Sequence, residues 1–160
     1  MRASVRIRER TTEDLPRCAA VLRAVHEDSR YPVVWPDDVE RWLTPRTMVQ
    51  AWVATRDGAV VGHVALGVLS QADGTRFGSI ERLFVDPARG RAGIGRRLLA
   101  HGLADAGHRG LPVELDVADG SVAAISLYER LGWRLVRRAP ISWGGDHASS
   151  VLTFHPPGQA

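Results

Sequence analysis

The chain has 160 residues, a length typical of one domain with a substantial buried core. All 21 basic residues are arginine, a usage typical of a GC-rich bacterial genome, and they exceed the 18 acidic residues by only three. The acidic residues are interspersed among the arginines, and neither a zinc-finger spacing nor an RNA-binding aromatic motif occurs. The composition therefore argues against a protein that binds nucleic acid.

Cys18 is the only cysteine, which excludes an intrachain disulfide and a CxxC metal or redox site and fits a reducing cytoplasm. The N-terminal segment MRASVRIRERTTEDL has no apolar run typical of a signal peptide, and no apolar run of about 18 residues occurs anywhere. The six histidines show no metal-ligand spacing. We therefore expect a soluble bacterial protein of the cytoplasm that binds no metal and no membrane.

Hydrophobic periodicity predicts the elements of the first half. Residues 4–10 alternate as a strand does, and residues 12–27 have helical spacing, with Thr11 and Asp14 in capping-box positions. An ordered loop with a short helix is expected over residues 29–43. Three strands follow in MVQAWVAT, AVVGHVALGVL and GSIERLFV, and the RDG turn between the first two predicts a hairpin. These three strands should form an antiparallel meander.

The second half predicts alternating helices and strands. A helix begins near Gly93, LPVELDV is a strand, and residues 121–131 form a helix that ends at Gly132. WRLVRRA and ASSVLTFH form a last strand pair around the loop PISWGGDH, and residues 156–160 should be a frayed tail. This order of elements predicts a single α/β domain over residues 1–160, built on one mixed sheet.

The segment VDPARGRAGIGRRLLAH combines arginines and glycines at the start of a predicted helix. Its glycines follow the spacing GxxGxG at Gly90, Gly93 and Gly95. The dinucleotide fingerprint GxGxxG fails because Leu98 stands where a glycine is needed, and the Walker A motif fails as well. Arg96 and Arg97 meet the positive end of the helix dipole, which costs a few tenths of a kcal/mol each. A bound diphosphate would offset these charges; the alternative is a solvated basic helix end with glycines that serve only the turn.

Two stretches resemble the GNAT superfamily of N-acetyltransferases. LFVDPARGRAGIGRRLLA is similar to its acetyl-CoA pyrophosphate loop, Arg/Gln-x-x-Gly-x-Gly/Ala after a Val-x-Pro strand end. SVAAISLYERLGW resembles its Asn-x-x-Ala-x-x-Leu-Tyr-x-x-x-Gly-Phe helix and following strand. The resemblance extends along nearly the whole chain. It implies a GNAT-like acyl-CoA N-acyltransferase fold, with one central mixed, mostly antiparallel sheet flanked by about four helices, and acetyl-CoA as co-substrate.

The chain departs from the family pattern at two positions. Gly90 stands where the family has Arg or Gln, with Arg89 and Arg91 on either side. Ser121 stands where the family has Asn, and although serine can cap a helix, it cannot copy the paired contact of an amide with pantetheine.

The resemblance also implies how the backbone holds acetyl-CoA. The amides of the glycine turn would bind the diphosphate, and the backbone of Val85 would pair with the pantetheine arm. The N–H of Leu83 would polarise the thioester carbonyl and stabilise the oxyanion that develops there. The residues implied to contact acetyl-CoA are Leu83, Phe84, Val85, Arg89, Gly90, Arg91, Ala92, Gly93, Ile94, Gly95, Arg96, Arg97, Ser121 and Tyr128.

Tyr128 and Glu81 are the candidate catalytic side chains. Ser121 and Tyr128 share one helical face, and the family's tyrosine at this point protonates the leaving thiolate; the alternative is an aromatic residue that anchors the helix to the sheet. Glu81 alternates with Leu83 and Val85 and so should share their strand face. It resembles the glutamate near the acceptor amine of aminoglycoside-modifying members, where it would accept a proton. The alternative is an edge carboxylate paired with an arginine.

The segment YPVVWPDD lies where this fold usually builds its acceptor wall. Aromatic faces beside carboxylates suit a small cationic amine. The candidate acceptor-binding residues are Tyr31, Trp35, Asp37 and His63. A structural role is the alternative for His63, and Trp143, Asp146 and His147 are further candidates for the pocket.

The leading hypothesis is acetyl transfer to a primary amine of a small molecule, by direct attack in a ternary complex. One alternative is acetylation of a protein N-terminus or lysine, which would need an open groove. Another is a non-catalytic acyl-CoA-binding sensor domain on the same fold. The sequence leaves the oligomeric state open between a monomer and a homodimer.

Overall fold

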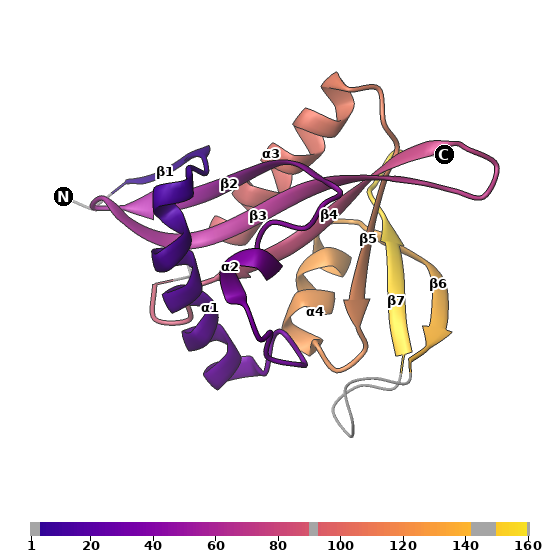
Figure 1. Cartoon of the computed structure of the whole chain (residues 1–160). Helices are drawn as coiled ribbons and strands as arrows, with labels where there is room; N and C mark the ends of the chain where they lie inside the picture. The colour runs from indigo at the N-terminus through magenta and orange to yellow at the C-terminus, as the bar shows by residue number, and fades with distance from the viewer. Residues whose placement is uncertain (1–3, 90–92, 142–149, 160) are drawn as a thin grey trace.

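Seven strands form one sheet in the computed structural model, which describes residues 4–89, 93–141 and 150–159 (Figure 1). Their order across the sheet is β1-β2-β3-β4-β5-β7-β6. The neighbours β4 and β5 run parallel and the other described neighbours antiparallel, which confirms the mixed, mostly antiparallel sheet. The strands are β1 (Val5–Glu9), β2 (Met48–Arg56), β3 (Ala59–Ser70), β4 (Arg76–Val85), β5 (Val113–Ala118), β6 (Arg134–Pro140) and β7 (Ser150–His155).

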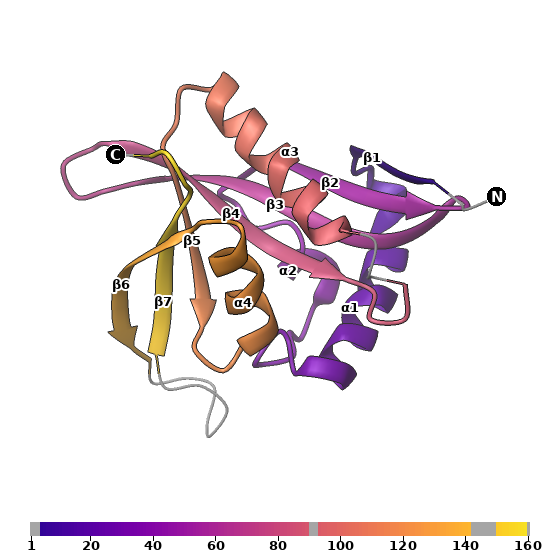
Figure 2. The same ribbon diagram turned by 180° about the vertical axis from the view of Figure 1, so that it is seen from behind.

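Helices cover both faces of the sheet. The 3-10 turn η1 (Thr12–Asp14) leads into α1 (Leu15–Ser29), and α1 and α2 (Val39–Trp42) lie on one face. The other face carries α3 (Ile94–His108) and α4 (Val122–Arg130), which Figure 2 shows in front of the sheet. In the part of the chain that the structure describes, no helix combines the length and apolar character that a membrane crossing requires.

Alternation along β2 explains why both faces are covered. Trp52 and Ala54 pack in the core on the α3 side, whereas Val53 between them packs with α1. Because successive side chains of a strand point to opposite faces, a run of apolar residues needs a helical layer on each side. The predicted RDG hairpin is confirmed: Asp57 and Gly58 have φ of 52° and 78°, the positive values that a type I′ turn requires.

The tail expected to fray is bound to β5 up to its last described residue. The Gln159 side chain accepts a hydrogen bond of 2.8 Å from the Val113 N–H and donates one of 3.0 Å to the Val113 carbonyl. Arg134 donates a further bond of 2.7 Å to the Gln159 carbonyl. The amide of Gln159 thus extends the pairing at the start of β5, which local composition does not predict.

The strands β4 and β5 pair for only part of their lengths. Their register joins Gly78, Ser79 and Ile80 to Val113, Glu114 and Leu115, and no pair follows within the described strands. Beyond these positions β4 continues to Val85 and β5 to Ala118, and Figures 1 and 2 show the two strands diverging. This divergence opens the sheet in its middle.

Candidate active site between diverging strands

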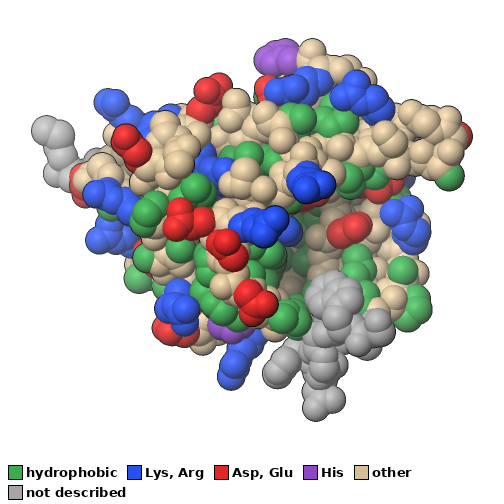
Figure 3. Space-filling model, in the orientation of Figure 1, with side chains coloured by type: hydrophobic (Ala, Val, Ile, Leu, Met, Phe, Trp, Pro, Cys, Tyr) green, Lys and Arg blue, Asp and Glu red, His purple; other side chains and the backbone are tan. Residues whose placement is uncertain are grey.

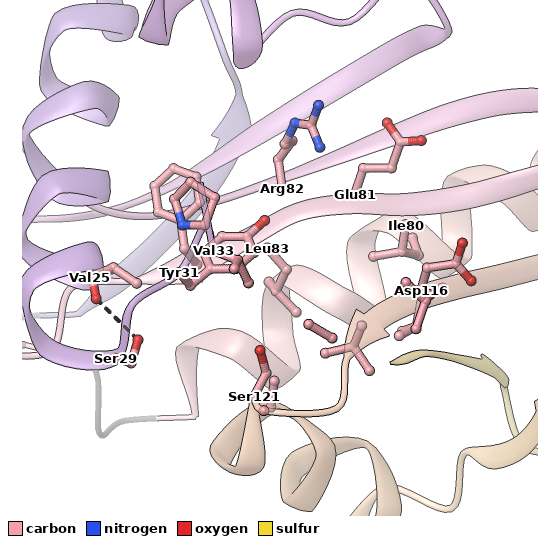
Figure 4. Close-up of a pocket in the computed structure, with 18 of the residues that line it drawn as sticks. Val25, Ser29, Tyr31, Val33, Ile80, Glu81, Arg82, Leu83, Asp116 and Ser121 are labelled. Carbon is pink, nitrogen blue, oxygen red and sulfur yellow. Dashed lines mark hydrogen bonds between the residues drawn. The ribbon is translucent and has the colours of Figure 1, made fainter. Parts of the chain in front are cut away.

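A cavity of about 840 Å³ occupies the opening between β4 and β5. The surface is hollowed near the centre of the view in Figure 3, on a face where basic and acidic side chains are intermixed. The lining comes from β4, β5, the start of α4 and the segment after α1 (Figure 4). Segments that are distant in sequence thus converge on one space at the carboxyl ends of two parallel strands.

Beyond Ile80, the edge of β4 that faces the cavity pairs with no other described strand. The Gly78 N–H donates a 2.7 Å bond to the Pro112 carbonyl beside β5, whereas the Asp86 N–H donates a 2.8 Å bond to Val61 on the β3 side. These two bonds leave opposite sides of β4 although the residues are eight apart, because a bulge inserts one residue between them. Alternation counted back from Asp86 directs the N–H groups of Leu83 and Val85 to the side where β5 has diverged. This free edge is suited to pairing with an extended ligand, and its amides can donate to a carbonyl oxygen.

A β-bulge interrupts β4 beside the cavity. Glu81 pairs with Ala65 and Phe84 with His63, so that two residues of β4 face a single residue of β3. Arg82, the first of the two, has a φ of 55°, the left-handed conformation that β-bulges can accommodate. The extra residue bends the strand and changes which side chains share a face.

The bulge corrects the expected alternation of Glu81 with Leu83 and Val85. Leu83 and Val85 pack against the core cluster on the α3 and α4 side, whereas Phe84 packs with α1. Glu81 and Arg82 lie on the same side of the strand in Figure 4. Strict alternation over this segment was therefore a wrong prediction, because it assumed an uninterrupted strand.

His63 of β3 stabilises this bulge by a hydrogen bond and by ring stacking. Its Nδ1 donates a 2.8 Å hydrogen bond to the Arg82 carbonyl, and its Nε2 accepts one of 2.9 Å from Arg10. Arginine can only donate, which fixes the proton on Nδ1. The ring also stacks on Phe84 at 5.0 Å between centroids. His63 is fully buried and is absent from the cavity lining, so the structure supports the structural alternative and places it outside the acceptor wall.

The buried His63 makes a prediction about stability and pH. Burial lowers the pKa of His63 to about 4, below the ordinary value of 6.5. Between these two values the unfolded chain binds a proton that the folded protein does not, so stability falls as pH falls below 6.5. From pH 7 to pH 5 the loss attributable to this group should be about 2 kcal/mol. Urea unfolding at both pH values measures this loss. The free energy of unfolding should fall less from pH 7 to pH 5 in His63→Gln than in the wild type.

The matched control is His101→Gln, at an exposed histidine of α3. This variant should keep the wild-type difference between pH 7 and pH 5. An equal loss in wild type and His63→Gln would contradict the assignment of a neutral, buried His63.

Tyr128 lines the cavity from α4 and is also packed in the core. Its ring lies 6.1 Å from that of Trp133 and 5.9 Å from that of Phe154, and the residue is only 6% exposed. Burial raises the pKa of Tyr128 above its usual value, so the phenol stays protonated at neutral pH. The residue anchors the helix and also presents a proton donor to the cavity.

Glu81 lines the cavity as a half-buried carboxylate. A Cβ on Gly67 of β3 would lie 3.1 Å from Glu81 Oε1, so the missing side chain of Gly67 leaves room for this carboxylate. Burial raises the pKa of Glu81, although the nearby Arg82 opposes the shift. No ion pair joins Glu81 to an arginine among the described residues, which argues against the predicted alternative of a paired edge carboxylate.

The acceptor wall differs in part from the expectation. Tyr31 lines the cavity beside Trp42, with 6.1 Å between the ring centroids. Trp35 does not reach the cavity; it packs 5.1 Å from the ring of His26. Asp37 is exposed and also lies outside the lining. The mixture of aromatic residues and carboxylates made the whole segment a candidate wall, but only its beginning faces the cavity.

Sequence reasoning missed several residues of the lining, Arg82 among them. Trp42 of α2 and Asp116 of β5 are two others that were not predicted as site residues. The Asp116 carboxylate accepts a 2.6 Å bond from the Thr153 hydroxyl on β7. A carboxylate near the end of a strand that precedes the second motif was the available signal, since ligands bind at the carboxyl ends of strands in open sheets.

The start of α3 is shaped to receive an anion. Gly93 is its N-cap, with φ of 70° and ψ of 25°, and the first turn contains no acidic residue. Ile94 is buried beneath it, and a Cβ on Gly95 would lie 3.4 Å from Leu127 of α4. A glycine N-cap has no side chain to satisfy the free N–H groups of the first turn, which leaves them available to a diphosphate.

Several predicted cofactor contacts have particular local roles. Arg97 donates a 2.9 Å bond to the Val5 carbonyl of β1, whereas Arg96 and Arg89 are exposed. Ser121 is the N-cap of α4 but makes no capping bond with its side chain, and it lines the cavity. The predicted contacts and pocket residues outside the described part of the chain are Gly90, Arg91, Ala92, Trp143, Asp146 and His147.

These features together fit acetyl-CoA. The helix start of α3 would hold the diphosphate, the free edge of β4 would pair with the amide-containing pantetheine arm, and the thioester would lie near Leu83 and Tyr128. Acetyl-CoA supplies an activated acetyl group whose carbonyl carbon is open to attack by an amine.

Comparisons with known proteins identify the family. A model described as "Acetyltransferase (GNAT) family" matches residues 9–133. No curated protein sequence is significantly similar to the chain. Among solved structures, the chain resembles the ribosomal-protein-S18-alanine N-acetyltransferase from Escherichia coli, with a TM-score of 0.75 and 22% identity over 98% of this chain and 96% of that one.

Two further structures contain acetyl-CoA. One is yncA, a putative acetyltransferase from Salmonella typhimurium, with a TM-score of 0.70 and 21% identity over 94% of this chain and 91% of that one. The other is NAA60 from Arabidopsis thaliana, with a TM-score of 0.73 and 20% identity over 96% and 99% of the two chains. The family match spans most of the chain, including both predicted motifs. The chain therefore belongs to the GNAT family of acetyltransferases, which use acetyl-CoA.

Proposed function

We propose that the protein transfers the acetyl group of acetyl-CoA to a primary amine of a small molecule, by direct attack within a ternary complex. The observation that supports this most strongly is the convergence of three groups on one cavity. They are the free backbone edge of β4 at Leu83, the phenol of Tyr128 and the carboxylate of Glu81. Each suits one stage of acyl transfer.

In this mechanism Glu81 accepts a proton from the amine, directly or through water, as the nitrogen attacks the thioester carbonyl carbon. The Leu83 N–H donates to the carbonyl oxygen as negative charge develops there. The carbon–sulfur bond then breaks, and Tyr128 donates its proton to the departing thiolate. The products are an N-acetylated amine and the free thiol of CoA, so no acetylated enzyme is formed.

Acetylation of a protein N-terminus is the second candidate, because the chain resembles the Escherichia coli enzyme that acetylates an alanine of a ribosomal protein. Val33 and Val34 beside the cavity give an apolar surface that could also accommodate a peptide. A sensor domain without activity is less well supported, because such a domain would not need a buried phenol and a half-buried carboxylate in the same cavity.

The test measures CoA thiol release from acetyl-CoA with a panel of free primary amines and short peptides. The proposal expects amine-dependent release, an equal amount of N-acetylated product, and initial rates that give intersecting double-reciprocal lines. Peptides used better than every free amine would favour the second candidate. Thiol release before any amine is added would contradict direct attack, and no release despite acetyl-CoA binding would favour the sensor domain.

Glu81→Gln should lower kcat/KM for the amine by about 10- to 100-fold and leave the Kd for acetyl-CoA unchanged. The raised pKa of Glu81 gives the sign of the pH dependence: the wild-type rate falls as pH falls through that pKa, because the carboxyl becomes protonated and cannot accept a proton. The variant should lack this limb of the profile. The control is Glu40→Gln, at an exposed carboxylate of α2, which should keep the wild-type pH profile. Identical pH profiles for Glu81→Gln and wild type would show that Glu81 is not the base.

A further inference from the structure

Arg82 is a charged residue of the cavity to which acetyl transfer assigns no task. Along a regular strand it would point away from the side that carries Glu81. The bulge instead places Glu81 and Arg82 on the same side, and both line the cavity (Figure 4). The cavity therefore presents a carboxylate and a guanidinium next to each other.

The guanidinium of Arg82 is held in place by α2. Its Nε donates a 3.0 Å hydrogen bond to the Trp42 carbonyl, and its Cζ lies 4.0 Å from the centroid of the Trp42 ring. The hydrogen bond fixes the position of the guanidinium edge that carries Nε, and the stacking on the ring fixes the guanidinium plane. An arginine held in this way loses little side-chain freedom when it binds a ligand.

The outer edge of this guanidinium remains available. In the described residues, Nη1 and Nη2 of Arg82 make no hydrogen bond, and the residue takes part in no ion pair. Two parallel N–H groups of an arginine match the two oxygens of a carboxylate. The edge that Arg82 leaves unpaired is thus a preformed fork for a planar anion.

The charges around the cavity limit what can bind there. The charged lining residues in the described chain are Glu81, Arg82 and Asp116. An acceptor with several ammonium groups would set one of them near Arg82 and be repelled. A phosphate dianion would be repelled by two carboxylates and attracted by one guanidinium. A single negative charge beside a single amine matches this arrangement best.

We propose that the acceptor is a small amine that also carries a carboxylate, which Arg82 binds through its two outer N–H groups while Glu81 faces the amine. This inference rests on the proposed function and specifies its substrate class as amino acids. The residue at a peptide N-terminus carries its amine but no free α-carboxylate, so the inference also favours a small molecule over a protein as acceptor.

The test compares acceptors that differ in one group. The panel contains α-amino acids with apolar side chains and the unbranched series from glycine to 6-aminohexanoate, each with its carboxamide, together with a polyamine, phosphoethanolamine and a tripeptide. Wild-type kcat/KM should be at least about 10-fold higher for the preferred acid than for its carboxamide. The distance between amine and carboxylate in the preferred acid would measure the reach from the thioester to Arg82.

Arg82→Gln should remove the preference by lowering kcat/KM for the acid far more than kcat/KM for the carboxamide, while the Kd for acetyl-CoA stays unchanged. Both rates are compared at a pH where Glu81 is ionised in both proteins, because Arg82 also lowers the pKa of Glu81. Arg82→Lys keeps the charge but not the fork and should retain part of the preference, which also guards against a folding defect in Arg82→Gln. Arg41→Gln, at an exposed arginine of α2, is the matched control and should keep the full preference.

The inference and the proposed function fail differently. Efficient acetylation of the polyamine, phosphoethanolamine, the tripeptide or the carboxamides, at rates equal to those of the acids, would overturn the inference and leave acetyl transfer intact. Equal losses for acid and carboxamide in Arg82→Gln would do the same. Absence of thiol release with every acceptor, despite acetyl-CoA binding, would overturn both.

Discussion

Gly93→Val should raise the Kd for acetyl-CoA by at least about 100-fold while the fold persists. Gly93 caps α3 with φ of 70°, a conformation that a β-branched residue adopts only with strain. Relief of that strain would turn the N–H groups of the first turn away from the diphosphate, and the valine side chain would occupy the space that the ligand approaches. The helix itself stays anchored, because Ile94, Leu98 and Leu99 are buried in the core.

The control for this variant separates backbone strain from ligand binding. Gly74 has φ of 86° and lies in the hairpin between β3 and β4, and a Cβ added there, as at Gly93, would meet no described atom within 4 Å. Gly74→Val should therefore lose similar stability and keep wild-type affinity for acetyl-CoA. Calorimetric titration measures both Kd values, and thermal unfolding measures both stabilities. A Kd for Gly93→Val as low as that of Gly74→Val would contradict a diphosphate site at α3.

Tyr128→Phe should lower kcat by about 100-fold, with little change in the Kd for acetyl-CoA or in stability. In the proposed mechanism the phenol hydrogen is needed when the thiolate departs, so its loss affects the transition state more than the bound ground state. The ring contacts with Trp133 and Phe154 survive the substitution. Steady-state kinetics on both proteins, together with acetyl-CoA titration and thermal unfolding, measure these three effects.

Tyr31→Phe provides the comparison, because Tyr31 is the other phenol that lines the cavity. Loss of the Tyr31 hydroxyl should act mainly on KM for the amine, since we propose that Tyr31 is part of the acceptor wall. A kcat within twofold of wild type for Tyr128→Phe, with binding unchanged, would leave Tyr128 as a packing residue and solvent as the source of the proton.

The fold could be predicted from the sequence because its signals are local. The hairpin at Asp57 and Gly58 and the end of α4 shortly before Gly132 follow from residues that accept positive φ. The two motifs are separated in sequence by β5, and the structure brings their residues Leu83 and Tyr128 to one cavity. Motif order and periodicity were sufficient for this much of the site.

The acceptor side could not be predicted because it depends on a change of register between distant strands. The bulge at Arg82 is stabilised by His63, which lies on another strand, and that residue is in turn bound to Arg10. No local pattern indicates that Arg82 leaves the strand alternation or that Trp42 lies beneath its guanidinium. His63 was consequently assigned to the acceptor wall, although the structure gives it a supporting position outside the cavity.

The central claim is that acetyl-CoA lies along the edge of β4 that β5 leaves free, and amide hydrogen exchange followed by NMR tests it most directly. The N–H groups of Leu83 and Val85 should exchange quickly in the free protein and become protected when acetyl-CoA is saturating. Gly78 is the internal reference, because its N–H already donates to the Pro112 carbonyl and should exchange slowly in both states. Exchange at Leu83 and Val85 that does not change on saturation with acetyl-CoA would contradict this placement.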